Sequence, residues 1–139
     1  METVEFLILK NLLHNEEYVR KVIPFIKGDY FEDINQKIVF EEIIKFVQEY
    51  NQPATKEVLC IEAEKRQDIT DESFKEITQL ISSLEKSDTE FEWLVNTTEK
   101  WCRDRAIYLA LMESIHIADG KDENKNRDSI PTILSDALG

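Results

Sequence analysis

The residues that could do chemistry are few in this sequence, and their spacing does not suit catalysis. A nucleotide-binding P-loop needs two glycines, a lysine and a hydroxyl residue, so that backbone N–H groups can surround phosphates. The glycines are Gly28, Gly120 and Gly139, and none of them opens such a loop. Neither His14 nor His116 is in metal-ligand spacing with a cysteine or a carboxylate pair. We therefore expect no cofactor and no metal in this chain.

The remaining reactive group is a cysteine beside two arginines, Cys102 with Arg103 and Arg105. Nearby positive charge lowers a thiol pKa and favours the reactive thiolate. The sequence places no base beside this cysteine, so a packed, unreactive thiol is the favoured interpretation.

Two short groups of acids could form a catalytic pair. They are Glu41 with Glu42, and Glu62 with Glu64. We interpret both as solvated helix faces. His116, near the end of a predicted helix, suits the partial negative charge there. The chain as given is expected to be non-catalytic.

Composition indicates one globular, helical domain with an appendage. The chain has 139 residues, of which 42% are hydrophobic and 33% charged, with three glycines and three prolines. Its net charge of −12 repels phosphate and favours protein partners over nucleic acid. Cys60 and Cys102 lie on different predicted helices, which favours a reducing cytoplasm over a disulfide framework. We expect no signal peptide and no membrane span.

The elements are organised around one long helix, residues 90–119, which contains neither proline nor glycine. As one helix it would be about 45 Å long, so part of it should project from a small domain. Thr89 and Glu92 fit a capping box at its start, and Gly120 suits its end.

The middle of this helix, residues 106–112, is apolar all round. Such a helix must be covered on more than one side. It is either a central core helix or an arm that packs on a second arm and on another subunit, and its length favours the arm. Residues 129–138 predict that second arm, with Ile130, Ile133, Leu134 and Leu138 on one face. We therefore expect domains at 1–89 and 90–139, the latter a protruding helical hairpin.

The first 89 residues predict a compact bundle of about five helices, so the fold class is all-α. The helices are expected at residues 2–14, 15–23, 33–50, 55–66 and 70–86. Asn15, Asp33, Thr55 and Thr70 are suited to cap the last four of them. The two aromatics of the turn between the second and third, Tyr30 and Phe31, are interpreted as core residues.

Several stretches, taken in order, resemble the N-terminal domain of DnaB-type hexameric replicative helicases, in particular those of T-even-type bacteriophages. Residues 4–31 are similar to the opening helical pair, which ends in an aspartate and two aromatics. Residues 35–47 and 53–63 are similar to the next two helices. Residues 103–106, Arg-Asp-Arg-Ala, resemble a motif in the first arm of the family's hairpin. One departure is the absence of a glycine that the family often carries in its first helix.

This resemblance implies a non-catalytic collar of six N-terminal domains, usually a trimer of dimers, with hairpins pairing between subunits. The collar sits on a ring of motor domains, absent from this chain, which bind ATP and Mg and move on single-stranded DNA. Implied partners are a second copy of the chain, primase and a helicase loader, with no membrane. A bacteriophage protein of this kind would act in the cytoplasm of the bacterial host.

From the apolar pattern and the resemblance together we expect a subunit or partner interface on the hairpin. Its residues are Trp101, Arg103, Arg105, Ile107, Tyr108, Leu111, Met112, Ile115, Ile130, Ile133 and Leu134. The alternative is a free-standing acidic adaptor, or a helicase-loader-like protein, that acts by protein contacts alone. A small helical enzyme is a third, less favoured class.

Overall fold

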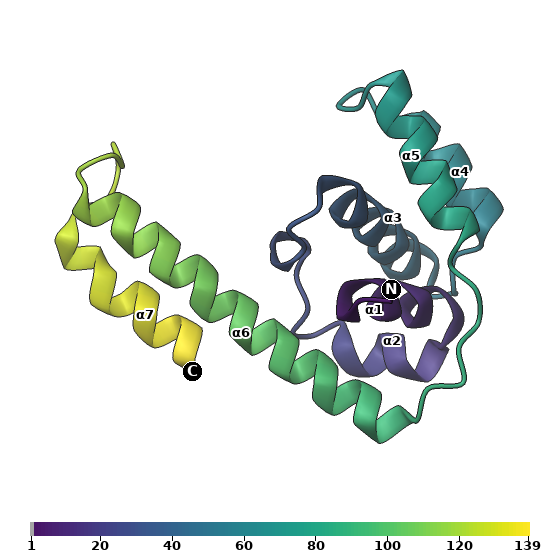
Figure 1. Cartoon of the computed structure of the whole chain (residues 1–139), viewed down its shortest axis with the longest axis horizontal. Helices are drawn as coiled ribbons and strands as arrows, with labels where there is room; N and C mark the ends of the chain where they lie inside the picture. Colours follow the sequence, from purple (N-terminus) through teal and green to yellow (C-terminus); the bar gives the residue numbers. More distant parts are fainter. Residues whose placement is uncertain (1) are drawn as a thin grey trace. The chain divides into compact units, whose positions relative to one another are not determined.

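The computed structural model describes residues 2–139, which form seven α-helices, two short 3-10 helices and no strand (Figure 1). The elements in chain order are α1 Val4–His14, α2 Glu16–Val22, η1 Gly28–Tyr30, α3 Ile34–Tyr50, α4 Lys56–Glu64, α5 Asp71–Ser82, α6 Phe91–Ala118, η2 Arg127–Ser129 and α7 Ile130–Leu138. The predicted all-α class, with five helices before a long one, is confirmed.

The chain divides into two compact units, Met1–Thr98 (unit 1) and Glu99–Gly139 (unit 2). The boundary falls inside α6, which continues through it as one helix of 28 residues. Our expected division into 1–89 and 90–139 stays a prediction about domains, because the units are separated within a continuous element.

Side-chain caps start four of the helices of unit 1 where the sequence predicted them. Asn15 accepts a hydrogen bond from the N–H of Tyr18, and Asp33 accepts from two N–H groups at the start of α3. Thr55 and Thr70 cap α4 and α5 in the same way. These side chains satisfy N–H groups that have no partner within the helix.

The start of α6 differs from the prediction. The helix begins at Phe91, so Glu90 rather than Thr89 occupies the capping position, and a Glu90 carboxylate oxygen accepts from the N–H of Trp93 at 2.6 Å. The Thr89 hydroxyl instead pairs with that of Ser87 at 2.6 Å. The predicted capping box of Thr89 and Glu92 is therefore wrong, because the helix starts one residue later than it requires.

The end of α6 is as predicted. Gly120 takes a left-handed conformation with φ of +73°, which a residue without Cβ adopts at little cost. Its N–H donates to the Ile117 carbonyl at 2.9 Å, and the Lys121 N–H donates to the His116 carbonyl at 3.1 Å. This pair of bonds is a Schellman motif, which reverses the chain toward α7.

The core of unit 1 lies between α1, α2, α3 and α5 and the start of α6. Its largest fully buried side chain is Tyr18, whose hydroxyl pairs with that of Thr98 at 2.6 Å. The Thr98 hydroxyl also donates to the Leu94 carbonyl, so these two buried hydroxyls are satisfied. Phe31 is buried against Phe40, with ring centroids 5.1 Å apart, as expected of a core residue.

Candidate interaction surface

The part of α6 that belongs to unit 2 has one buried face. Ala110, Ser114 and Ile117 recur at spacings of four and three residues, which places them on one side of a helix, and all three are buried. In the same compact unit α7 runs back alongside α6 (Figure 1). Within this hairpin the apolar side chains of α7 that the sequence assigned to the interface are half-buried: Ile130, Ile133 and Leu134.

A second apolar face of α6 lies on the opposite side and is open. Tyr108, Leu111, Met112 and Ile115, hereafter the apolar stripe, are 50%, 48%, 48% and 54% exposed. Their spacing of three, one and three residues puts them on one face over two turns. Scattered exposed hydrophobics are ordinary, but a continuous set marks a surface for a protein partner.

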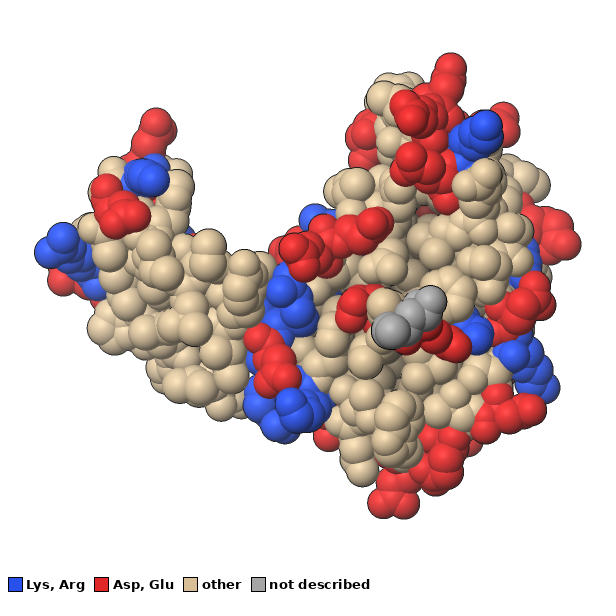
Figure 2. Space-filling view, in the orientation of Figure 1, with Lys and Arg blue, Asp and Glu red and all other residues tan. Residues whose placement is uncertain are grey.

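The setting of the stripe is poor in charge. Residues 106–118 contain a single acid, Glu113, and α7 contains a single acid, Asp136. Figure 2 shows one face of this unit, on which uncharged side chains form a broad area and charged ones gather near its ends. Interface centres are depleted in charge in this way.

The other predicted interface residues of α6 divide between two places. Arg105 extends the stripe by one turn, with its guanidinium 5.0 Å from the centre of the Tyr108 ring. Trp101 lies seven residues before Tyr108, hence on the same face, and is half-buried. Ile107 is half-buried beside the stripe, whereas Arg103 is exposed and lies roughly 140° around the helix from Tyr108. The structure therefore gathers all of these residues except Arg103 at or beside the stripe.

The loop that joins the two arms is held to α6. Lys125 pairs with Glu113 at 2.7 Å, and this ion pair raises the pKa of Lys125. The Asp122 carboxylate accepts from the N–H groups of Asn124 and Lys125, which lowers the pKa of Asp122. These bonds fix the chain reversal that brings α7 back along α6.

Cys102 is a packed thiol, as predicted. It is buried, and burial, aided by the negative charge of Glu99, raises the pKa of the Cys102 thiol to about 12. Loss of solvation disfavours the charged form of a thiol, so the structure favours the packed, unreactive interpretation over a thiolate activated by the neighbouring arginines.

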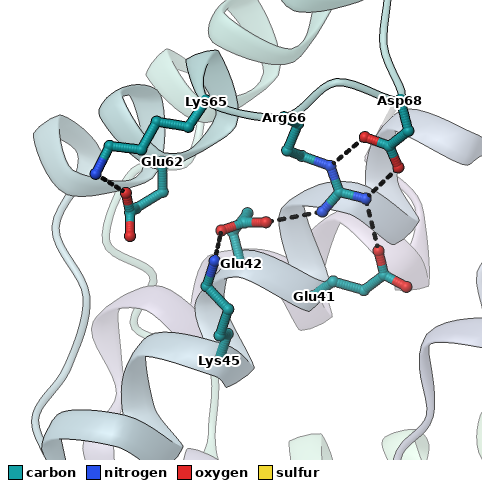
Figure 3. A network of polar contacts seen from close by, with 7 residues as sticks. All are labelled: Glu41, Glu42, Lys45, Glu62, Lys65, Arg66 and Asp68. Carbon is teal, nitrogen blue, oxygen red and sulfur yellow. Dashed lines mark hydrogen bonds and ion pairs between the residues drawn. The ribbon is translucent and has the colours of Figure 1, made fainter.

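A polar network in unit 1 corrects a second expectation. Glu42 is only 4% exposed, so Glu41 and Glu42 do not together form a solvated face. Arg66, just after α4, donates to Glu42 at 2.7 Å and to Glu41 at 3.2 Å on α3 (Figure 3). A carboxylate on the apolar side of α3, between Ile38 and Ile43, must have a cationic partner, and that signal in the sequence was missed.

The network continues into the turn between α4 and α5. Arg66 also binds both carboxylate oxygens of Asp68, at 2.9 and 2.7 Å, and the guanidinium lowers the pKa of Asp68. Lys45 pairs with Glu42 at 3.2 Å, and Lys65 with Glu62 at 2.7 Å. Each acid in Figure 3 is paired with a cation, so the network ties α3 to α4 and its following turn rather than supplying a free base. Within residues 2–139 no group of three metal-binding side chains occurs.

A small apolar cleft with a volume of about 30 Å³ opens elsewhere in unit 1. Leu12, Leu13, Val19 and Val47 line it, and an ion pair between Glu16 and Arg20 lies at its rim. A cleft of this size is far below the roughly 300–1,000 Å³ of ligand pockets, and it has room only for a small apolar group of a partner.

In the described part of the chain, no helix has the length and hydropathy needed to span a membrane.

No protein-family model matches the sequence. The chain is 31% identical over 140 aligned residues, or 95% of its length, to a DnaB-like replicative helicase of Enterobacteria phage T4. It spans only 29% of that relative, which is consistent with an N-terminal domain. The similarity supports a helicase-related domain, and it extends far beyond the individual motifs noted above. Along nearly its whole length, therefore, this chain is similar to a phage DnaB-like replicative helicase, as its sequence motifs predicted.

Proposed function

We propose that this chain is the non-catalytic N-terminal collar domain of a ring-shaped replicative DNA helicase, in which the hairpin of unit 2 joins subunits. The observation that carries the proposal is the apolar stripe of α6. Four large side chains stay about half-exposed on a charge-poor face, although the opposite face of the same helix is buried. A second copy of the hairpin would remove this surface from water, which contributes about 25 cal/mol per Å² of apolar area.

In this proposal ATP hydrolysis, Mg binding and movement on single-stranded DNA belong to a motor domain outside these residues. The protein would act in the cytoplasm of a bacterial host infected by the phage. The similarity to a DnaB-like replicative helicase supports this assignment, because the chain matches only 29% of the length of that relative.

We further propose that unit 1 is a docking platform for primase, and secondarily for a helicase loader. Unit 1 carries 21 acidic and 11 basic residues, and a primase needs basic surface for nucleic acid, so the charges are complementary. A docking surface also needs apolar contacts, since charges at a rim add little affinity, and the small cleft beside Leu12 and Val19 would accept a small apolar group of the partner.

The self-association part is tested by sedimentation velocity of the full-length protein and of residues 1–139 over a range of concentrations. We expect the mass of the short chain to rise reversibly with concentration. A short chain that stays monomeric at every concentration, while the full-length protein forms rings, would assign ring assembly to the motor alone.

The docking part is tested by a pull-down of the cognate primase with residues 1–139 and, separately, with the motor fragment. We expect capture by residues 1–139 at moderate salt. Capture by the motor fragment alone would remove the docking role and leave ring assembly.

The alternative of a free-standing adaptor is tested by the reading frame, since a P-loop lysine downstream of Gly139 supports the helicase and a stop codon supports the adaptor.

A further inference from the structure

We propose that α4, the turn after it and α5 (residues 55–83, hereafter the α4–α5 pair) open together from the rest of unit 1, and that Arg66 holds them closed. Proteins open locally in cooperative segments that have few buried apolar contacts. The two helices lie side by side and pack against each other (Figure 1). Such an opening lies within unit 1 and does not depend on ring assembly or on primase docking.

The α4–α5 pair contributes few large side chains to the core. Helix α4 buries Leu59 and Ala63 among its nine residues, and α5 buries Ile77 and Ile81 among its twelve. The eleven residues of α1 bury four apolar side chains, all of them leucine or isoleucine. Because buried apolar surface is the main source of stability, the pair is held less firmly than α1 by such contacts. Polar contacts therefore have a larger share in holding it.

The two helices are joined to each other, and the chain on either side of them is anchored. The Lys56 ammonium at the start of α4 donates to the Ser82 carbonyl at the end of α5 at 3.0 Å. Ala54 before the pair and Leu84 after it are 5% and 0% exposed. His14 Nε2 on α1 lies 2.6 Å from the Leu84 carbonyl oxygen. The backbone would therefore bend next to these two anchored residues as the pair opens.

The polar contacts between the pair and α3 differ in burial. The contact of Asn35 with Glu76, at 2.7 Å, is exposed, whereas Arg66 donates to Glu42, which is 4% exposed. A buried carboxylate that loses its cation is strongly disfavoured. Lys45 belongs to α3 itself and can stay with Glu42 in both forms. Because water would surround Glu42 in the open form, removal of Arg66 penalises the closed form and not the open one.

Opening of the pair would uncover one face of α3. Asn35, Ile38 and Glu42 recur at spacings of three and four residues and thus share that face. The first of them contacts α5 and the last contacts Arg66, so Ile38, which is 4% exposed, lies beneath the pair. The closed form therefore keeps this apolar side chain and the Glu42 carboxylate away from water, and the open form exposes both.

The test is amide hydrogen exchange of the 139-residue chain, followed residue by residue by NMR, under conditions in which the rate reports the open fraction. We expect the slowest amides of α4 and of α5 to share one open fraction, at least about tenfold larger than that of α1. Val22→Ala changes a buried position of α2, which packs on α1, and so destabilises the closed and the open form alike. It should speed exchange in α1 and leave exchange in α4 and α5 unchanged.

Variants of the network test the role of Arg66. Arg66→Met should speed exchange in α4 and α5 about tenfold or more, because the closed form then contains a poorly paired carboxylate. The double variant Glu42→Leu with Arg66→Met replaces both partners by apolar groups and should regain most of the difference. The control Lys65→Met removes a pair with Glu62 at the end of α4 itself, and should change exchange by less than about twofold.

Three results would contradict the proposal. If α4 and α5 exchange as slowly as α1, and Val22→Ala speeds all three equally, unit 1 opens only as a whole. If α4 and α5 differ in open fraction, the two helices do not open together. If the pair opens but Arg66→Met leaves its exchange unchanged, apolar contacts rather than Arg66 hold it closed.

Discussion

The two units of this chain differ in how completely they bury their large apolar side chains. Unit 1 encloses large side chains such as Leu12, Tyr18 and Ile43 completely and carries 21 acids against 11 bases. Unit 2 carries 8 acids against 6 bases, buries only small or medium side chains of α6, and leaves the apolar stripe about half-exposed. Unit 1 is thus stabilised mainly from within, whereas unit 2 keeps apolar surface available for association. The following predictions test this contrast.

The largest effect is expected in the core of unit 1. Ile43→Ala removes a side chain that is 0% exposed and leaves a cavity, which should lower the free energy of unfolding by about 2–5 kcal/mol. The matched control is Ile115→Ala in the stripe, which should change stability by less than about 0.5 kcal/mol. Urea unfolding followed by circular dichroism measures both. Equal losses would show that the stripe is covered within one copy, and would remove the contrast.

The next effect concerns the polar network of unit 1. Arg66→Met leaves the buried Glu42 with Lys45 as its remaining partner, and should lower stability by about 1–3 kcal/mol. Lys65→Met removes the ion pair of an exposed lysine with the less buried Glu62; it serves as the control and should cost less than Arg66→Met.

The pH dependence of the same network follows from Asp68. Its pKa in the folded state lies below the ordinary value of 3.8, so the contribution of its pair with Arg66 is present at neutral pH. That contribution is lost as the pH falls through the lowered pKa. The stability difference between the original chain and Arg66→Met should accordingly shrink in acid. A difference that grows below pH 3.8 would contradict this role of the network.

Association should respond to a change that leaves the fold intact. Leu111→Asp puts a charge in the middle of the stripe and should weaken self-association about tenfold or more, because each copy brings a charge that must lose solvation. Its melting temperature should stay unchanged, since Leu111 is 48% exposed. Thr132→Asp adds the same charge to an exposed position of α7, and should leave both association and melting unchanged. Sedimentation velocity and thermal melts decide the outcome.

The smallest effect is expected at the turn between the two arms. Gly120→Ala places a Cβ on a residue with φ of +73°, which should cost about 1 kcal/mol. No other atom would obstruct this Cβ, so the cost arises from backbone conformation alone. An alanine variant that melts at the original temperature would show that the turn relaxes to another conformation.

Local signals in the sequence were sufficient for the fold. The caps at Asn15, Asp33, Thr55 and Thr70 and the glycine after α6 depend only on neighbouring residues, and each was predicted correctly. The capping box at Thr89 was predicted wrongly because Asp88, Thr89 and Glu90 are consecutive and each can cap a helix. The sequence does not decide between them, and Glu90 is the residue that caps α6. Helix α5 ends at Ser82, short of the predicted residue 86. The hydroxyls of Ser82 and Ser83 donate to carbonyls of the last turn, and such bonds compete with the hydrogen bonds that would continue the helix.

Non-local information was needed for the rest. The periodicity of residues 106–112 predicted that α6 needs cover on more than one side, but not which apolar residues α7 would cover. Arg66 and Glu42 are 24 residues apart, and their ion pair depends on how α4 packs on α3. Likewise the burial of Cys102, which decides the state of its thiol, cannot be deduced from the adjacent arginines.

The Arg66 network constrains the order in which this sequence can evolve. The largest part of the cost of losing Arg66 arises from the buried side chain of Glu42, so the effects of substitutions at the two positions are strongly epistatic. We expect Glu42→Gln to be tolerated first, after which Arg66 can be replaced by other residues. If Arg66 is replaced first, the variant that still contains Glu42 is destabilised. In a mutational library, variants that lack Arg66 should therefore be enriched for neutral residues at position 42 among the survivors.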